Sequence, residues 1–151
     1  MRLLLIALPK DREIAGWGHL FDADGKIAHS FPARGKADSQ KASAKGNQDR
    51  FTRHPFGDTP SGRYAVTRIV AVGDPELAKT TRLGSHWIPL TGSDGDAFNA
   101  WRLGRTGLGI HGGRGEDLVV TYGCVRVRDS DMTKLRDLIG GEEVLPIIED
   151  I

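Results

Sequence analysis

Cysteine is nearly absent from this sequence, with one residue, Cys124, among 151. A single thiol cannot form a disulfide within the chain, which excludes a disulfide-stapled scaffold. It also excludes a metal site that needs two or more thiolates, and the histidines show no paired spacing, so we expect no metal. The lone cysteine is therefore either an inert core residue or a nucleophile.

An excess of charge of one sign is also missing. The chain has 21 basic and 20 acidic residues and a formal net charge of +1, which argues against a nucleic-acid partner held by bulk charge. Long apolar runs are missing too. The run Leu3–Leu8 stops at Pro9, so it is too short to span a bilayer and lacks the small-residue cleavage site of a signal peptide. We expect it to be a buried first strand.

Glycine, in contrast, is abundant. The 20 glycines are about 13% of the 151 residues, against an average near 7%. So many turn residues, in a chain of this length with 38% apolar residues, predict one mostly β domain over residues 1–151. One or two short helices complete the expected fold.

The spacing of apolar and turn residues places the individual elements. The predicted strands are Leu3–Leu8, Trp17–Phe21, Lys26–Phe31, Arg63–Val72, His86–Leu90, Leu108–Gly113, Leu118–Thr121 and Val144–Ile148. A helix is predicted to begin at a cap on Asp129 or Ser130 and to end at Gly140, with a further helical turn over residues 74–79. Residues 35–53 and 91–96 are predicted to be exposed loops.

Two short segments combine residue types that carry chemistry. Ile110–Gly113 holds His111 before two glycines, and Thr121–Val127 holds Cys124 directly after a glycine. Cysteine attacks as the thiolate, and a free thiol with a pKa of about 8.5 is mostly protonated at neutral pH, so it needs a base. His111 is the candidate base, facing Cys124 across an expected hairpin. A carbonyl of the Gly112–Gly113 turn is expected to fix the tautomer of the ring.

The residues on either side of the cysteine suggest further roles. Gly123 lets the backbone approach closely, so the amides of Gly123 and Cys124 are expected to face an oxyanion. If this segment is extended, Arg126 points to the same side as Cys124, where it can hold a substrate carboxylate. The alternative is that Cys124 is an inert buried thiol, since one histidine, one cysteine and one arginine in this order also arise by chance.

The surroundings of these residues resemble the L,D-transpeptidase catalytic domain, the YkuD-like family of peptidoglycan cross-linking enzymes. That family's pattern is His-Gly, a loop, Ser or Thr, usually His, then Gly-Cys, an apolar residue, and Asn or Arg. Here His111-Gly112 matches the first part and Thr121–Arg126 the second. Two departures are Tyr122, where the family often has histidine, and a shorter loop before Thr121. Thr59–Tyr64 resembles the family's Thr-Pro turn before a core strand.

The resemblance extends along most of the chain. Leu3–Phe31 looks like the family's opening strands, and Asp131–Gly141 with the strand after it looks like the closing helix and strand. It implies a single-domain β-sandwich or barrel that acts on peptidoglycan stem peptides in the periplasm or cell wall without a cofactor. We expect a monomer with no nucleic-acid partner and no membrane span. Because no signal peptide is recognisable, the export route and a cytoplasmic pool stay open.

The resemblance also implies the reaction. A thiolate attacks the bond between diaminopimelate, or its equivalent, and a terminal D-alanine, and a second stem resolves the acyl-enzyme. The catalytic candidates are Cys124, His111, Gly112 and Gly123, and the substrate-binding candidates are Arg126, Thr121, Tyr122 and Trp87. Core packing is the alternative for Trp87.

Two other functions stay open at this stage. One is a hydrolytic L,D-carboxypeptidase or endopeptidase, such as a secreted antibacterial effector or a phage-related enzyme, in which water resolves the acyl-enzyme. The other is a non-catalytic module of the same fold that binds cell-wall peptide, which Tyr122 and the short loop before Thr121 would fit.

Overall fold

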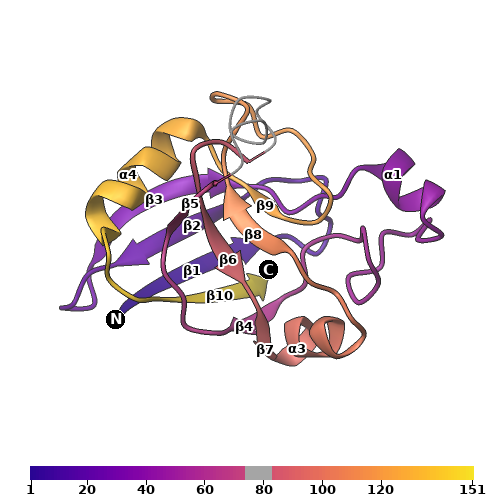
Figure 1. Ribbon diagram of the computed structural model, residues 1–151, viewed down its shortest axis with the longest axis horizontal. Coiled ribbons are helices and arrows are strands. Elements are labelled where there is room, and N and C mark those ends of the chain that lie inside the picture. Colours follow the sequence, from indigo (N-terminus) through magenta and orange to yellow (C-terminus); the bar gives the residue numbers. More distant parts are fainter. Residues whose placement is uncertain (74–82) are drawn as a thin grey trace.

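The computed structural model describes residues 1–73 and 83–151, and its strands form two mixed sheets (Figure 1). The strands are β1 (Arg2–Leu8), β2 (Gly16–Phe21), β3 (Ile27–Ala33), β4 (Gly62–Tyr64), β5 (Val70–Ala71), β6 (His86–Leu90), β7 (Gly92–Asp94), β8 (Leu108–His111), β9 (Val125–Arg126) and β10 (Val144–Asp150). The helices are α1 (Ser39–Ala44), α3 (Gly95–Arg102) and α4 (Asp129–Ile139). One sheet has the order β3-β2-β1-β10-β4-β7, and the other has the order β5-β6-β8-β9.

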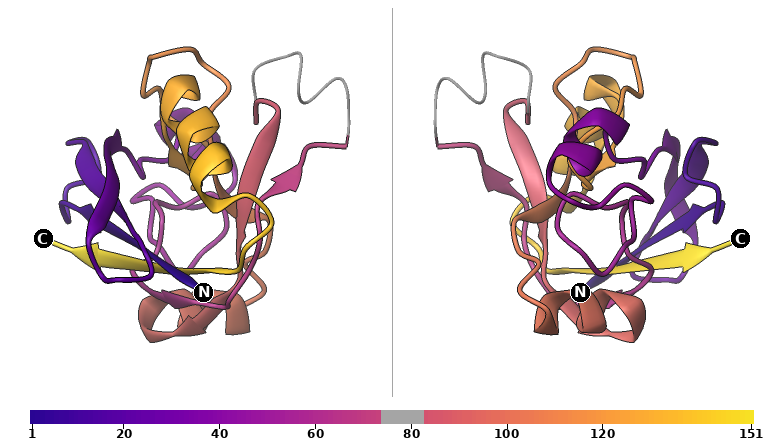
Figure 2. Two further views of the ribbon diagram at one scale, coloured as in Figure 1. Left: turned by 90° about the vertical axis from the view of Figure 1, so that its left-hand side faces the viewer. Right: turned by 90° about the vertical axis from the view of Figure 1, so that its right-hand side faces the viewer.

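One hydrophobic core joins the two sheets. Side chains from β1, β2, β3, β4 and β10 pack with side chains from β6, β8 and β9, and α4 adds Met132, Leu135 and Ile139. Figure 2 shows α4 lying between the two sheets at one end of the molecule. Within the described residues the sheets stay open, so the mostly β prediction is confirmed as a two-sheet structure, without barrel closure and with three helices instead of one or two.

The predicted strands at the two ends of the chain are confirmed. In β1, Leu4, Ile6 and Leu8 are fully buried, because β1 lies between β2 and the parallel strand β10. The predicted hairpin is the antiparallel pair β2 and β3. Its turn is held by the Asp22 carboxylate, which accepts hydrogen bonds from the backbone N–H groups of Asp24 and Lys26.

The predicted strand Arg63–Val72 is wrong as a single element. Its first part is β4, paired with β10 and β7, and its last part is β5, paired with β6 in the other sheet. Thr67 makes only an isolated bridge to Val144 between them. The β-branched residues of this segment favour a strand, but propensity does not specify the partner strand. The chain here crosses from one sheet to the other.

The two predicted loops contain α1 and the start of α3. Residues 39–44 form α1, capped by the Asp38 carboxylate, which accepts from the Lys41 N–H at 2.7 Å. The predicted loop at residues 91–96 contains β7 and the start of α3, capped by Asp94. Both helices bury only alanines, so neither shows the large buried apolar side chains that indicate α4 in the sequence.

Three further predictions concern the ends of α4, residues 118–121 and residues 74–79. Helix α4 ends at Gly140, which has φ +57°, as predicted, but it begins after Arg128 and has no side-chain cap. The predicted strand Leu118–Thr121 is absent, apart from a bridge between Thr121 and Ala37. The predicted helical turn at residues 74–79 lies outside the described residues. Among the helices of the described ranges, none has the length and apolar character needed to cross a membrane.

Candidate active site

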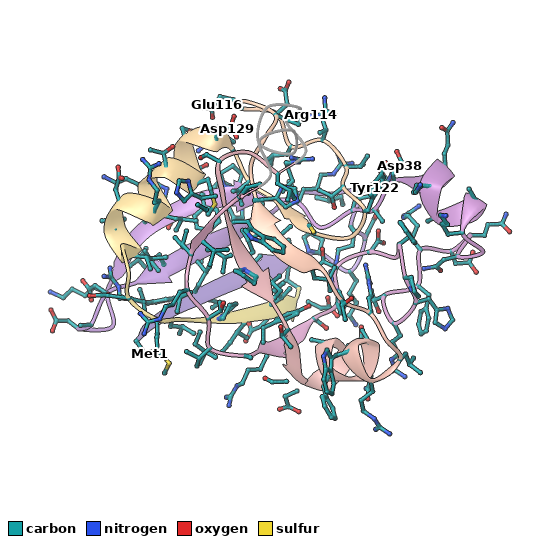
Figure 3. The ribbon with its side chains drawn as sticks, in the orientation of Figure 1. Met1, Asp38, Arg114, Glu116, Tyr122 and Asp129 are labelled. Carbon is teal, nitrogen blue, oxygen red and sulfur yellow. The ribbon has the colours of Figure 1, made fainter. Side chains whose placement is uncertain are left out.

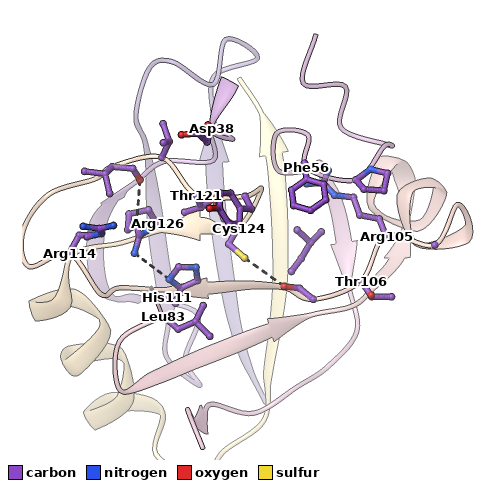
Figure 4. A pocket seen from close by; sticks show the side chains of 17 residues that line it. Asp38, Phe56, Leu83, Arg105, Thr106, His111, Arg114, Thr121, Cys124 and Arg126 are labelled. Atoms are coloured by element: carbon purple, nitrogen blue, oxygen red, sulfur yellow. Dashed lines mark hydrogen bonds between the residues drawn. The ribbon is translucent and has the colours of Figure 1, made fainter. Parts of the chain in front are cut away.

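Strands β8 and β9 bring His111, Cys124 and Arg126 into one cavity, which Gly112 and Gly123 do not line. They run parallel, with Ile110 opposite Val125 and His111 opposite Arg126, so the expected hairpin between His111 and Cys124 is wrong. Side chains alternate along a strand, which places His111, Arg126 and Cys124 on the same face. All three line a cavity of about 790 Å³ (Figure 4).

The Cys124 thiol is partly exposed in this cavity. Its Sγ lies 3.7 Å from the Gly107 carbonyl oxygen, at the approach to β8. Burial raises the pKa of the Cys124 thiol, while the Gly109 backbone N–H and the guanidinium groups of Arg105 and Arg126 act in the opposite direction. Because burial has the largest effect, the resting side chain is a thiol, and a base must remove its proton before it attacks.

The ring of His111, the predicted base, is held in one orientation. Its side chain is 2% exposed, and its Nδ1 lies 2.8 Å from the Gly112 carbonyl oxygen. Since a carbonyl only accepts, the neutral ring carries its proton on Nδ1 and leaves the lone pair on Nε2. Burial lowers the pKa of His111 to about 4, against the hydrogen bond to Gly112, so the ring is neutral at physiological pH.

Arg126 supports the same turn. Its side chain is 4% exposed, and its guanidinium donates to the carbonyl oxygens of Gly112 and Val119, the latter at 3.4 Å. The Gly112 oxygen therefore accepts from both Arg126 and His111, which fixes the ring in place. Arg126 thus braces the base as well as lining the cavity, and its contact with a substrate carboxylate stays a prediction.

The turn before Cys124 is held by the Thr121 hydroxyl. Its Oγ1 accepts from the Gly123 N–H at 2.9 Å and donates to the Cys124 carbonyl oxygen at 2.8 Å. The Gly123 amide therefore donates to Thr121 in this structure, and its role as an oxyanion donor stays a prediction. The Cys124 amide is the other predicted donor.

Replacing Thr121 with valine should loosen this turn. Valine has nearly the same shape but no hydroxyl, so the Gly123 N–H loses its acceptor, at a cost of about 1–3 kcal/mol in the free energy of unfolding. We expect the rate of covalent modification of Cys124 to fall about tenfold, because the nucleophile is held less firmly. Urea denaturation and labelling kinetics measure the two effects. Thr121→Ser, which keeps the hydroxyl, is the control, and equal behaviour of the two variants would contradict the assignment.

The turn after Gly112 is held by Asp129, which the sequence interpretation used only as a helix cap. Asp129 accepts from the Gly113 N–H at 2.6 Å and from the Gly115 N–H at 3.0 Å. A Cβ on Gly112 would lie 2.3 Å from its Oδ1, so a larger residue at this position would displace the Asp129 carboxylate. Figure 3 shows Asp129 at the end of the molecule where the loop after His111 turns back.

Residues 21–144 match the family model of the YkuD, or L,D-transpeptidase, catalytic domain. The chain belongs to this family. No curated protein sequence matches it. Among solved structures, Bd1075 of Bdellovibrio bacteriovorus is similar at 20% identity and a TM-score of 0.56, covering 97% of this chain and 48% of that one. The helical cell shape determining protein Pgp2 of Campylobacter jejuni is similar at 16% identity and a TM-score of 0.55, covering 99% of this chain and 48% of its own.

At these identities, the similarity to Bd1075 and Pgp2 shows a shared fold. The chain spans about half the length of Bd1075 and of Pgp2. The family acts on peptidoglycan, which is found in the cell wall and periplasm.

The remaining predicted substrate-binding residues of this L,D-transpeptidase domain lie in different places. Tyr122 is 54% exposed at the cavity and packs edge-on against Phe56, with their ring centroids 5.9 Å apart. It lies beside Asp38 at the edge near α1 (Figure 3). Trp87 lies on β6 opposite His111 and covers Gly109, where an added Cβ would meet its ring at 2.2 Å. Trp87 does not line the cavity.

The sequence interpretation gave no role to Arg105, one of the charged residues of the cavity. Arg105 follows Gly104 in the loop after α3, and it lines the cavity although its side chain is 5% exposed. Its contacts are to backbone carbonyl groups far away in the chain. The only sequence signal was an arginine in a glycine-rich loop before the His-Gly motif.

Proposed function

We propose that this domain is a cysteine-dependent L,D-transpeptidase that acts on peptidoglycan stem peptides in the periplasm or cell wall. One observation carries the proposal: the Nδ1 atom of His111 is held by the Gly112 carbonyl in the cavity that also exposes the Cys124 thiol. Family membership supplies the substrate class, and this geometry supplies a nucleophile with an oriented base.

The first half of the reaction forms an acyl-enzyme. The Cys124 Sγ transfers its proton to the His111 Nε2 and attacks the carbonyl carbon of the residue that precedes the terminal D-alanine. The oxyanion that forms receives a hydrogen bond from the Cys124 backbone N–H. When the C–N bond breaks, His111 returns the proton to the leaving amine of D-alanine, and a thioester remains on Cys124.

The second half decides the product. An amine from another stem attacks the thioester, gives up a proton to His111 and leaves a cross-link, while the regenerated thiolate recovers its proton. Water attacking in the same way gives the carboxypeptidase product. Tyr122 lies at the edge of the cavity, so we propose that it contacts the incoming acceptor.

Purified tetrapeptide stem fragments test the proposed function. We expect release of D-alanine together with peptide dimers, detected by mass spectrometry of the products. Release of D-alanine with tripeptide as the only other product would instead assign the hydrolytic function. If a folded wild-type protein releases no D-alanine, the enzyme assignment fails and the domain is a peptide-binding module.

A further inference from the structure

The partly exposed Cys124 thiol is uncharged at rest, so a fixed positive charge beside it favours its ionisation. We propose that Arg105 is a positioning residue that clamps the Cys124 turn and holds a permanent positive charge next to the forming thiolate. The proposal rests on the proposed function in one respect, that Cys124 is the nucleophile. It adds a residue to which neither the motif nor the family match assigns a role.

The first support is the way in which Arg105 is held. Its guanidinium donates to the carbonyl oxygens of Thr52, Gly57 and Asp58, the last at 2.8 Å. These three acceptors belong to the segment before β4, while Arg105 belongs to the loop between α3 and β8. A side chain that is 5% exposed and anchored to several backbone oxygens has a fixed position.

The second support is the contact between Arg105 and the residue before the nucleophile. A Cβ built on Gly123 would lie 2.0 Å from the Nη2 atom of Arg105 and 2.6 Å from the Gly57 oxygen. Gly123 also has φ +118°, a conformation that favours glycine. The guanidinium therefore packs directly on the backbone of the turn. In Figure 4, Cys124 lies between Arg105 on one side and Arg126 with His111 on the other.

The third support is that no contact ion pair within residues 1–73 and 83–151 neutralises this charge. In the described part of the chain, every hydrogen bond of Arg105 goes to an uncharged backbone carbonyl. Burial lowers the pKa of Arg105 from its ordinary value, but a guanidinium remains charged in proteins. Its charge lowers the pKa of the Cys124 thiol against the effect of burial. A fixed cation thus adds to the positive charge that His111 acquires when it takes the proton of Cys124.

Alkylation of the single cysteine by iodoacetamide, measured as a function of pH, tests this role without any peptide substrate. Arg105→Met keeps an unbranched apolar chain but loses the charge. We expect its alkylation profile to move to higher pH and its rate at neutral pH to fall by about 5- to 10-fold, a pKa rise of about one unit or slightly less. Arg105→Lys keeps the charge, so its profile should stay close to that of the wild type although its thermal stability falls.

The matched control is Arg102→Met, which removes an exposed arginine at the end of α3. Its alkylation profile should coincide with that of the wild type. An unshifted profile for a folded Arg105→Met variant would overturn the proposal. If that variant does not fold, Arg105→Lys decides, because a profile shifted upward by a unit despite the retained charge also overturns it. Since this readout needs no turnover, a wild type that releases no D-alanine would refute the proposed function and leave this test intact.

Discussion

Cys124→Ala should abolish covalent labelling by a carbapenem while leaving the fold unchanged. In the wild type, the thiolate opens the β-lactam ring and forms a thioester, so the protein gains the full mass of one inhibitor molecule. Cys124 is the only cysteine of the chain, and no second thiol can replace it. Alanine removes one sulfur whose hydrogen bond to the Gly107 carbonyl is 3.7 Å long, so we expect little loss of stability.

Intact-protein mass spectrometry measures the adduct, and circular dichroism checks the fold. We expect stoichiometric labelling of the wild type and no labelling of Cys124→Ala, with a loss of D-alanine release on the order of 10⁴-fold or more. An adduct on the alanine variant would show that another residue is the nucleophile. A folded wild type that gains no adduct would argue for the non-catalytic module.

The residues whose roles were predictable share one property: they are close together in the sequence, or next to one another in the chain. The strand Leu3–Leu8 follows from an uninterrupted apolar run, and the end of α4 follows from Gly140. The hydrogen bond between His111 and the next residue's carbonyl could also be anticipated, because it joins adjacent positions.

The contacts that were not predictable join distant segments through the backbone. Arg105 donates to backbone carbonyl oxygens about fifty positions earlier in the chain. Because every residue has a carbonyl oxygen, the sequence does not indicate which ones Arg105 contacts. Asp129 could act as a helix cap by sequence, but it binds the Gly113 and Gly115 amides instead. Similarly, β propensity described the extended segment 63–72 without showing that it divides between two sheets.

His111→Asn should remove the proposed base, Nε2, while keeping the hydrogen bond to the Gly112 carbonyl. The asparagine amide nitrogen can take the position of Nδ1 and donate to the Gly112 carbonyl, but nothing replaces Nε2. We expect the rate of acylation at neutral pH to fall by about 10²- to 10⁴-fold. The residual rate should rise with pH until the thiol ionises, because the variant can use only thiolate that has already formed. His19→Asn, on β2 and outside the cavity, is the control. A variant with the wild-type rate would exclude His111 as the base.

The same variant should remove an acid-sensitive part of the stability. The pKa of His111 is about 4 in the folded protein against 6.5 for a free side chain, so between these values only the unfolded chain takes up the proton. The stabilisation is therefore complete above pH 6.5 and is lost as the pH falls toward 4. Between about pH 7 and about pH 4.5, the free energy of unfolding should fall by about 2–3 kcal/mol more in the wild type than in His111→Asn. Urea denaturation at the two pH values measures this difference, and parallel losses in both proteins would show that His111 is not buried as a neutral base.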